Sequence, residues 1–153
     1  MRERQAARER RRAREFEVFV GGAGGRLLHA ALLLTGEPRE AERLLTSALA
    51  RTYAAWDGLR GEDPYDRARR DLATAFVRSA RRYRHHDGAI LGRLPPRERL
   101  VLVLRLYEGV AEEQTAACLG LSVERVRTLC ARAVATTSTT PPVPSGLRGS
   151  RAR

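Results

Sequence analysis

Lysine and asparagine are absent from this sequence of 153 residues, and all 29 of its basic residues are arginine. This pattern is typical of a genome rich in G and C, in which arginine codons replace lysine codons. The number of arginines is therefore no sign in itself of selected contacts with guanine. The net charge of +11 still favours a polyanionic partner, and nucleic acid before a membrane surface, because such a charge attracts polyanions.

Cysteine is also scarce, and the residues that carry catalysis or bind metals form no known pattern. Cys118 and Cys130 occupy small-hydrophobe positions of two predicted helices, without a CxxC or Cys/His spacing, so we expect free thiols in the interior. There is no glycine-rich phosphate loop after a strand, no nucleophile elbow and no pair of converging carboxylates. We therefore expect no enzyme activity, no metal site and no cofactor.

Long hydrophobic runs are missing as well. The longest, such as Ala-Ala-Leu-Leu-Leu at 30–34, are too short to cross a bilayer. The basic segment 1–14 is followed by Glu15, Glu17 and a glycine cluster, and not by the apolar core of a signal peptide. We expect a cytoplasmic protein without a membrane partner.

The positive charge is concentrated in two segments. Residues 1–14 contain seven arginines and two glutamates, and residues 67–84 contain seven arginines and one aspartate. We predict that 1–14 form a basic disordered arm. At the other end, residues 136–153 are rich in Thr, Pro, Ser and Gly, and we predict a disordered tail.

Hydrophobic periodicity predicts helices throughout the rest of the chain. Between 38 and 56, small or apolar residues recur at steps of three and four and form one face: Ala41, Leu44, Leu45, Ala48, Leu49, Thr52, Tyr53 and Trp56. Pro38 suits the first position of this helix, and Gly36 suits the end of the preceding one. A further helix is predicted to start with Asp63 as N-cap and Pro64, and to bury Tyr65, Ala68, Leu72, Phe76, Ala80 and Tyr83.

The opposite face of that helix carries a stripe of five arginines: Arg67, Arg70, Arg78, Arg81 and Arg82. Two interpretations are open, a solvated helix face and a surface that contacts phosphates. The density of charge favours the second, and we predict that Arg78, Arg81 and Arg82 bind DNA.

Glycine is dense in one place, with four glycines among residues 21–25. Each glycine disfavours a helix by about 1 kcal/mol relative to alanine. We therefore predict two helical pieces joined by a hinge in this segment.

Residues 94–135 have the pattern of a helix-turn-helix. A helix begins at Pro95-Pro96, a short second helix covers "AEEQTAACLG", and Gly120 suits the left-handed conformation of a tight turn. Ser122 is the predicted N-cap of a third helix. Val123, Val126, Cys130 and Ala133 are predicted to face the core of this domain.

The rest of the third helix is predicted to face DNA or to flank the contact. Glu124, Arg125, Thr128, Ala131 and Arg132 point outward, with Arg127 and Leu129 at the flanks. We expect this helix to enter the major groove, with Ser122 at a phosphate. Arg125 and Thr128 would then lie nearest the base edges, with Arg127 and Arg132 on the backbone.

These segments resemble a known family. "LPPRERLVLVLRLYEGVAEEQTAACLGLSVERVRTLCARA" resembles region four of the extracytoplasmic-function (ECF) sigma factors, and "LLTGEPREAERLLTSALARTYAAW" resembles their region two. The resemblance implies an all-α fold of two small helical domains. These are a region-two-like helical bundle at 15–84 and a region-four-like helix-turn-helix at 94–135, separated by a short linker at 85–93.

The resemblance also implies partners. They are core RNA polymerase and promoter DNA, the latter in double-stranded and in melted form. An anti-sigma factor is a further partner that the family allows. The polymerase-binding positions that correspond to the family pattern are Arg43, Leu44, Leu45 and Ser47.

Three departures from the family keep a second interpretation open. Arg43-Leu44-Leu45-Thr46-Ser47 stands where the family has acidic and amide residues, and Thr74 replaces an asparagine of the promoter-melting helix. Leu129 stands where the recognition helix has a hydrogen-bond donor. The chain is therefore either a sigma factor that initiates transcription or a degenerate sigma-like DNA-binding regulator or decoy that does not support initiation. A protein-interaction helical bundle is a third alternative.

Overall fold

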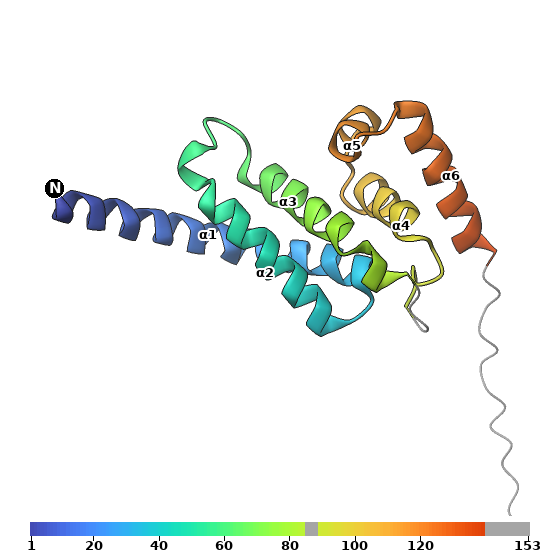
Figure 1. The fold of residues 1–153 in the computed structure, drawn as a ribbon, viewed down its shortest axis with the longest axis horizontal. Helices are drawn as coiled ribbons and strands as arrows, with labels where there is room; N and C mark the ends of the chain where they lie inside the picture. The colour runs from blue at the N-terminus through green and yellow to red at the C-terminus, as the bar shows by residue number, and fades with distance from the viewer. Residues whose placement is uncertain (85–88, 140–153) are drawn as a thin grey trace, which may run out of the picture.

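The described part of the chain is helical. The computed structural model describes residues 1–84 and 89–139, and these ranges contain no strand. They form the elements α1 (Arg2–Thr35), α2 (Pro38–Ala54), η1 (Trp56–Gly58), α3 (Pro64–Arg78), η2 (Ala80–Tyr83), α4 (Pro96–Leu102), η3 (Val103–Tyr107), α5 (Glu112–Leu119) and α6 (Val123–Ser138) (Figure 1). The predicted all-α class is confirmed. Residues 85–88 of the predicted linker and 140–153 of the predicted tail lie outside the described residues, whereas 136–138, also predicted as disordered tail, continue α6.

The predicted helix starts are confirmed by their caps. Pro38 is the first residue of α2, and Gly36 ends α1 with a left-handed φ of 75°. The carboxylate of Glu37 accepts hydrogen bonds from two backbone N–H groups in the first turn of α2. The Asp63 carboxylate accepts from the N–H of Tyr65 at 2.8 Å, which caps α3 as expected for this residue type.

Helix α1 differs from both predictions for its segment. It runs unbroken from Arg2 to Thr35, so neither the disordered arm at 1–14 nor the hinge at the glycines is present. Contacts on both sides of the glycines stabilise the continuous helix. Phe16 packs on Tyr53 and Trp56 with ring centroids 4.9 and 5.2 Å apart, and the C-terminal turns of α1 are buried in the core. The first turns project beyond the body of the protein (Figure 1).

The same helix corrects the expectation that no segment could cross a bilayer. By length and composition alone, α1 contains a stretch long and apolar enough to do so. The core helix of a soluble protein meets the same criterion. Here Leu27, Ala31 and Leu34 are buried against other helices of the protein.

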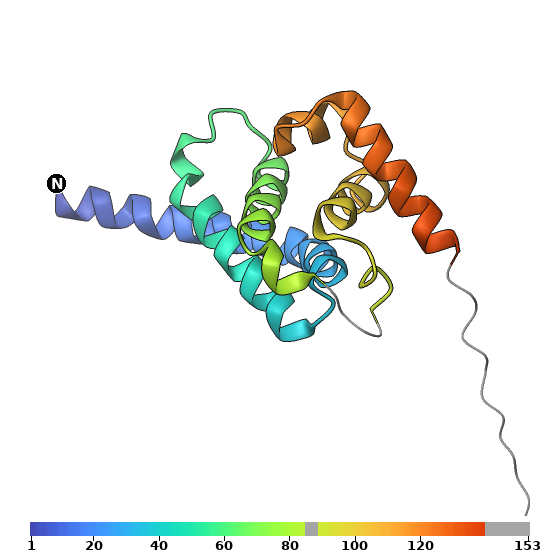
Figure 2. The ribbon, with the colours of Figure 1, turned by 45° about the vertical axis from the view of Figure 1, so that its right-hand side comes forward.

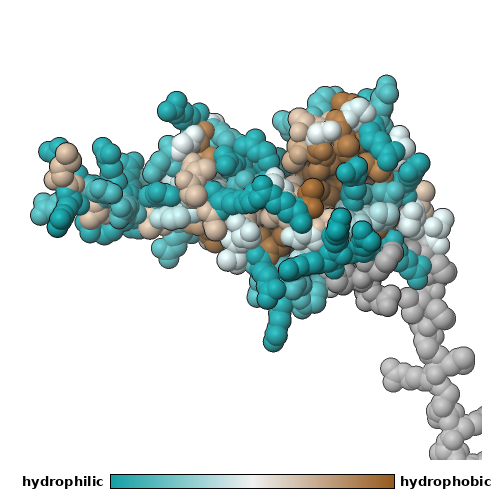
Figure 3. All heavy atoms as spheres, viewed as in Figure 1, coloured by the Kyte–Doolittle hydropathy of each residue, from teal (hydrophilic) through white to brown (hydrophobic). Residues whose placement is uncertain are grey.

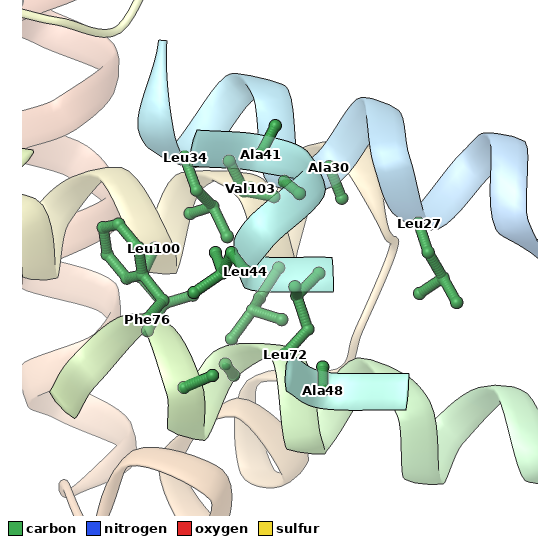
Figure 4. Packing of buried hydrophobic residues seen from close by; sticks show 14 of the residues in the cluster. Leu27, Ala30, Leu34, Ala41, Leu44, Ala48, Leu72, Phe76, Leu100 and Val103 are labelled. Atoms are coloured by element: carbon green, nitrogen blue, oxygen red, sulfur yellow. The ribbon is translucent and has the colours of Figure 1, made fainter. Parts of the chain in front are cut away.

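One hydrophobic core joins the two predicted domains. Leu34 of α1, Leu44 of α2, Phe76 of α3 and Leu100 of α4 are buried in the same cluster (Figure 4). In both ribbon views α3 lies between α2 and α4 (Figures 1 and 2). The helix-turn-helix therefore packs directly on the N-terminal bundle.

Part of the predicted linker belongs to this core. Leu91 of the linker and Leu94, the first residue of the helix-turn-helix segment, are 8% and 1% exposed and pack in the shared cluster, whereas Ile90 is 85% exposed. The prediction of a spacer between separate domains is therefore corrected, because Leu91 holds the connection against the bundle. The physical reason is that burial of these two leucines is favourable, which the packed arrangement provides.

A buried carboxylate also links the domains. The side chain of Glu108, which follows η3, is 1% exposed. Both of its oxygens accept from the Tyr65 hydroxyl at 2.9 Å, and the guanidinium groups of Arg26 and Arg69 lie 3.6 and 3.8 Å away. Burial and this carboxylate raise the pKa of Tyr65, which stays a hydrogen-bond donor at neutral pH.

A second buried charge, Arg99 of α4, is 1% exposed. Its guanidinium donates to the backbone carbonyls of Leu34 at 2.7 Å, Leu91 at 3.1 Å and Leu94 at 3.0 Å. The Leu34 carbonyl lies in the last turn of α1, where carbonyls lack helical partners and carry the negative end of the helix dipole. Burial lowers the pKa of Arg99, and among the described residues no carboxylate forms an ion pair with it.

We expect Arg99→Met to lower the free energy of unfolding by about 3 kcal/mol, because three buried carbonyls lose a charged donor. Urea denaturation measures the change. Arg97→Met is the matched control, since Arg97 is exposed on the same helix and its replacement should change stability by less than about 0.5 kcal/mol. Equal stability of the Arg99→Met variant and the wild type would contradict the structural role of this side chain.

Candidate nucleic-acid interface

The turn between α5 and α6 has the geometry predicted from the sequence. Gly120 adopts a left-handed φ of 65°, and the Leu121 N–H donates to the Ala116 carbonyl at 3.0 Å. Ser122 caps α6, because its hydroxyl oxygen accepts from the Arg125 N–H at 3.1 Å. Helices α5 and α6 therefore form the predicted helix-turn-helix.

The outward face of α6 is as predicted. The five residues predicted to point outward, Glu124, Arg125, Thr128, Ala131 and Arg132, are all exposed, as is Arg127. Val126 and Ala133 anchor the helix from behind and are fully buried. The Thr128 hydroxyl donates to the Glu124 carbonyl at 3.0 Å, which leaves its lone pairs free to accept a hydrogen bond from a ligand.

The prediction that Leu129 lies at the flank of the DNA-facing surface is wrong. It is 3% exposed and packs with Val101, Ala116 and Val126. The signal for this was present in the sequence, because Val126, Leu129 and Ala133 follow the spacing of a single helix face. Leu129 is therefore part of the hydrophobic core and does not stand in for a lost DNA contact. The free thiol of Cys130, predicted to lie in this core, is half-buried, as is that of Cys118.

Arg127 is exposed but engaged by an acid. Its Nε lies 2.7 Å from a carboxylate oxygen of Glu112, at the start of α5, and this contact raises the pKa of Arg127. Exposed ion pairs contribute little to stability, so a phosphate can replace this carboxylate. Arg132 has no ion pair within the described residues.

The predicted arginine stripe is divided into two parts. Arg67 lies 3.2 Å from the Asp71 carboxylate, and Arg70 forms an ion pair with Glu62. Arg78, Arg81 and Arg82 are exposed, and within the described ranges they form no ion pair. Arg70 is exposed as well, so the three arginines predicted to bind DNA are set apart as those of the stripe that have no ion pair within the described residues.

The four positions of α2 predicted to bind polymerase fall in different environments. Leu44 is 4% exposed and belongs to the shared core, so its side chain is not accessible to a partner (Figure 4). Leu45 is half-buried on the flank of α2 that faces α1. Arg43 and Ser47 are exposed on the opposite flank, beside α3.

That second flank contributes to a groove that sequence analysis did not identify. The arginine groove, as we call it, lies between α2 and the end of α3 and is lined by Arg43, Arg51, Arg78 and Arg82 with Ser47 and Ser79. The spacing of 43, 47 and 51 by four residues indicates one side of α2, but which helix faces this side depends on tertiary packing.

The helix-turn-helix, whose second helix α6 is capped and exposed, is the structure of a DNA-binding protein. Comparison with known proteins identifies the family. Residues 90–136 match the family model for sigma-70, region 4. The RNA polymerase sigma-E factor of Streptomyces avermitilis is 35% identical over 147 residues, with 79% of this chain and 82% of the relative covered.

Two further relatives agree. The RNA polymerase sigma-E factor of Streptomyces antibioticus is 34% identical, over 79% of this chain and 81% of the relative. That of Streptomyces coelicolor is 32% identical, over 79% and 82%. The chain belongs to the sigma factors of RNA polymerase of the ECF type, and its function is in transcription initiation. The resemblance inferred from the sequence is confirmed.

The burial of Leu129 predicts the result of adding a positive charge to α6. Leu129→Arg should lower the free energy of unfolding by on the order of 4 kcal/mol, because it places an unpaired guanidinium in the core. It should not strengthen DNA binding. Ala131→Arg adds the same charge on the exposed face, and we expect it to keep the stability and strengthen non-specific binding. Urea denaturation and duplex titration measure both variants, and a stable, tighter-binding Leu129→Arg protein would show that Leu129 faces DNA.

Proposed function

We propose that this sigma factor binds core RNA polymerase and directs it to promoter DNA, which α6 reads in the major groove. The observation that carries the proposal is the exposed polar face of α6, supported from behind by buried Val126, Leu129 and Ala133. A buried apolar side fixes the orientation of the helix, and its free side can then meet a groove. The protein itself performs no catalytic step in this function.

Each exposed residue of α6 has a proposed role in DNA binding. Ser122 and the first N–H groups of the helix approach a phosphate, and Arg125 and Thr128 lie nearest the base edges. Arg127 and Arg132 contact the backbone. Glu124 suits the positive end of the helix dipole and can accept from a cytosine amino group.

The N-terminal bundle has the second DNA surface and the polymerase surface. Arg78, Arg81 and Arg82 are proposed to contact phosphates, supported by their exposure and lack of ion pairs within the described residues. The proposed polymerase surface is the α1-facing flank of α2 near Leu45. A shallow, mostly apolar hollow there is lined by Ala13, Phe16, Thr46, Leu49, Ala50 and Tyr53.

The partners proposed for the protein indicate where in the cell it acts. Core polymerase and promoter DNA are found in the cytoplasm of a bacterium, so we place the protein there. An anti-sigma factor is a further proposed partner, and it would regulate the protein by covering its polymerase or DNA surface.

Polymerase binding is tested by co-purification. We expect the tagged protein to recover core RNA polymerase and to support initiation from a promoter template in vitro. Thr46→Arg should reduce polymerase recovery at least tenfold, because it places a charge in the apolar hollow. Ala7→Arg, an equal change on the projecting part of α1, should leave recovery unchanged. A wild-type protein that binds duplex DNA but recovers no polymerase would instead support the degenerate regulator.

Base reading by α6 gives a separate prediction. Arg125→Ala should relax the preference at one base pair by about 1 to 3 kcal/mol, because a bidentate arginine contact with guanine is lost. Arg132→Ala should weaken binding to all sequences alike. Competition among duplexes that differ by single base pairs, starting from one selected in a random library, separates the two effects. Unchanged preference and affinity in both variants would contradict the proposed docking of α6.

A further inference from the structure

The arginine groove brings together residues that sequence analysis assigned to two different partners. Arg43 and Ser47 were predicted to bind polymerase, and Arg78 and Arg82 to bind DNA. In the structure all four line the same hollow, which has a volume of about 240 Å³. Hydrophilic side chains cover much of the surface over α2 and α3 (Figure 3).

Local structure explains how the walls of the groove form. On α2, positions 43, 47 and 51 follow each other at intervals of one turn, beside the buried residues Leu44 and Ala48. Arg78 ends α3, and Arg82 follows in η2. Packing of α2 on α3 buries the apolar faces of both helices and leaves these arginines on either side of the hollow.

The charge of the groove is only partly compensated. Glu40 lies 3.6 Å from Arg43 and also accepts a hydrogen bond from the Tyr83 hydroxyl at 3.0 Å. Arg51, Arg78 and Arg82 have no ion pair within the described ranges. Tyr83 lines the same hollow as Arg43 and Arg82. Burial and the Glu40 carboxylate raise the pKa of Tyr83, and the charges of the two arginines oppose that rise.

Such an arrangement favours an anionic ligand. Guanidinium groups of like charge that share one hollow repel each other, and a bound anion relieves this repulsion. The planar guanidinium also matches the oxygens of a phosphate in a bidentate contact. The volume lies below the range of about 300 to 1,000 Å³ typical of small-molecule pockets, which favours a segment of a larger ligand.

We propose that the arginine groove binds consecutive phosphates of one DNA strand, through Arg43 and Arg51 on α2 together with Arg78 and Arg82. From Arg43 to Arg51, α2 rises by about 12 Å, which matches the axial rise of roughly three phosphates of a strand. This inference rests on the proposed function, because the DNA is the promoter on which the sigma factor acts. It moves Arg43 and Ser47 to the DNA surface and leaves the other flank of α2 for polymerase.

The test compares two double variants of the full-length protein. Arg43→Gln/Arg51→Gln removes two charges from the α2 wall, and Arg39→Gln/Arg97→Gln removes two exposed arginines outside the groove. The probe is a labelled DNA of random sequence, double-stranded in one series and single-stranded in the other. The dissociation constant is measured between 50 and 200 mM salt, with thermal unfolding as a check of folding.

We expect the groove variant to lower the slope of log affinity against log salt by roughly two, since each phosphate contact contributes about 0.9 for duplex DNA and about 0.7 for a single strand. Over this fourfold range of salt, the affinity of the wild type should fall about tenfold more than that of the groove variant. The control variant should change the slope by less than about 0.5. The change in slope is divided by about 0.9 in the duplex series and by about 0.7 in the single-stranded series, and the series in which this quotient is nearer to two contacts identifies the form of DNA that occupies the groove.

Polymerase recovery separates this inference from the proposed function. The groove variant should still recover core polymerase. An unchanged slope with normal recovery would overturn the inference and leave the proposed function intact, because the groove would then be a solvated surface. An unchanged slope with lost recovery would also overturn it and assign the groove to an acidic surface of polymerase. Failure of the wild type to recover polymerase would instead count against the proposed function.

Discussion

The joint between the two helical units depends on the buried guanidinium of Arg99. Arg99 belongs to α4, and its side chain donates three hydrogen bonds, one to Leu34 in the last turn of α1 and two to the connection, at Leu91 and Leu94. A cation can be buried here because the helix-end carbonyl of Leu34 and two carbonyls of the connection replace its hydration. The helix-turn-helix is thereby held at a fixed position on the bundle, and Leu91 and Leu94 become part of the core.

The Glu108 carboxylate complements this joint at another point of contact. Tyr65 and Arg69 from α3 and Arg26 from α1 surround it, so one buried anion is matched by groups from the other unit. Buried charges of this kind contribute less to net stability than to the choice of one arrangement, because any other packing leaves them without partners. The packed form leaves the polar face of α6 and the end of α3 exposed, so both proposed DNA surfaces are accessible in it.

Helix α2 shows how one helix serves several surfaces. Its apolar stripe, centred on Ala41, Leu44 and Ala48, is buried. The flank beside α1 borders an apolar hollow, and the flank beside α3 borders the arginine groove. The charge reversal at Arg43, which departs from the family pattern for a polymerase-facing helix, falls on the arginine-rich flank. An arginine in place of an acidic residue is unfavourable for binding polymerase at this position, but it is favourable for binding DNA phosphates.

The amino-acid sequence by itself determined the helical class, the starts of α2, α3 and α4, the turn at Gly120 and the outward face of α6. These follow from local rules, such as proline at a first turn, an Asp or Ser cap and the period of the helix. Tertiary structure decided the rest. Helix α1 crosses its glycines because Phe16 and Leu27 are packed on either side of them. Leu91 of the short connection lies in the core, and arginines of α2 and of the α3 end line one groove. Both outcomes depend on contacts between residues far apart in the chain, which local rules do not specify.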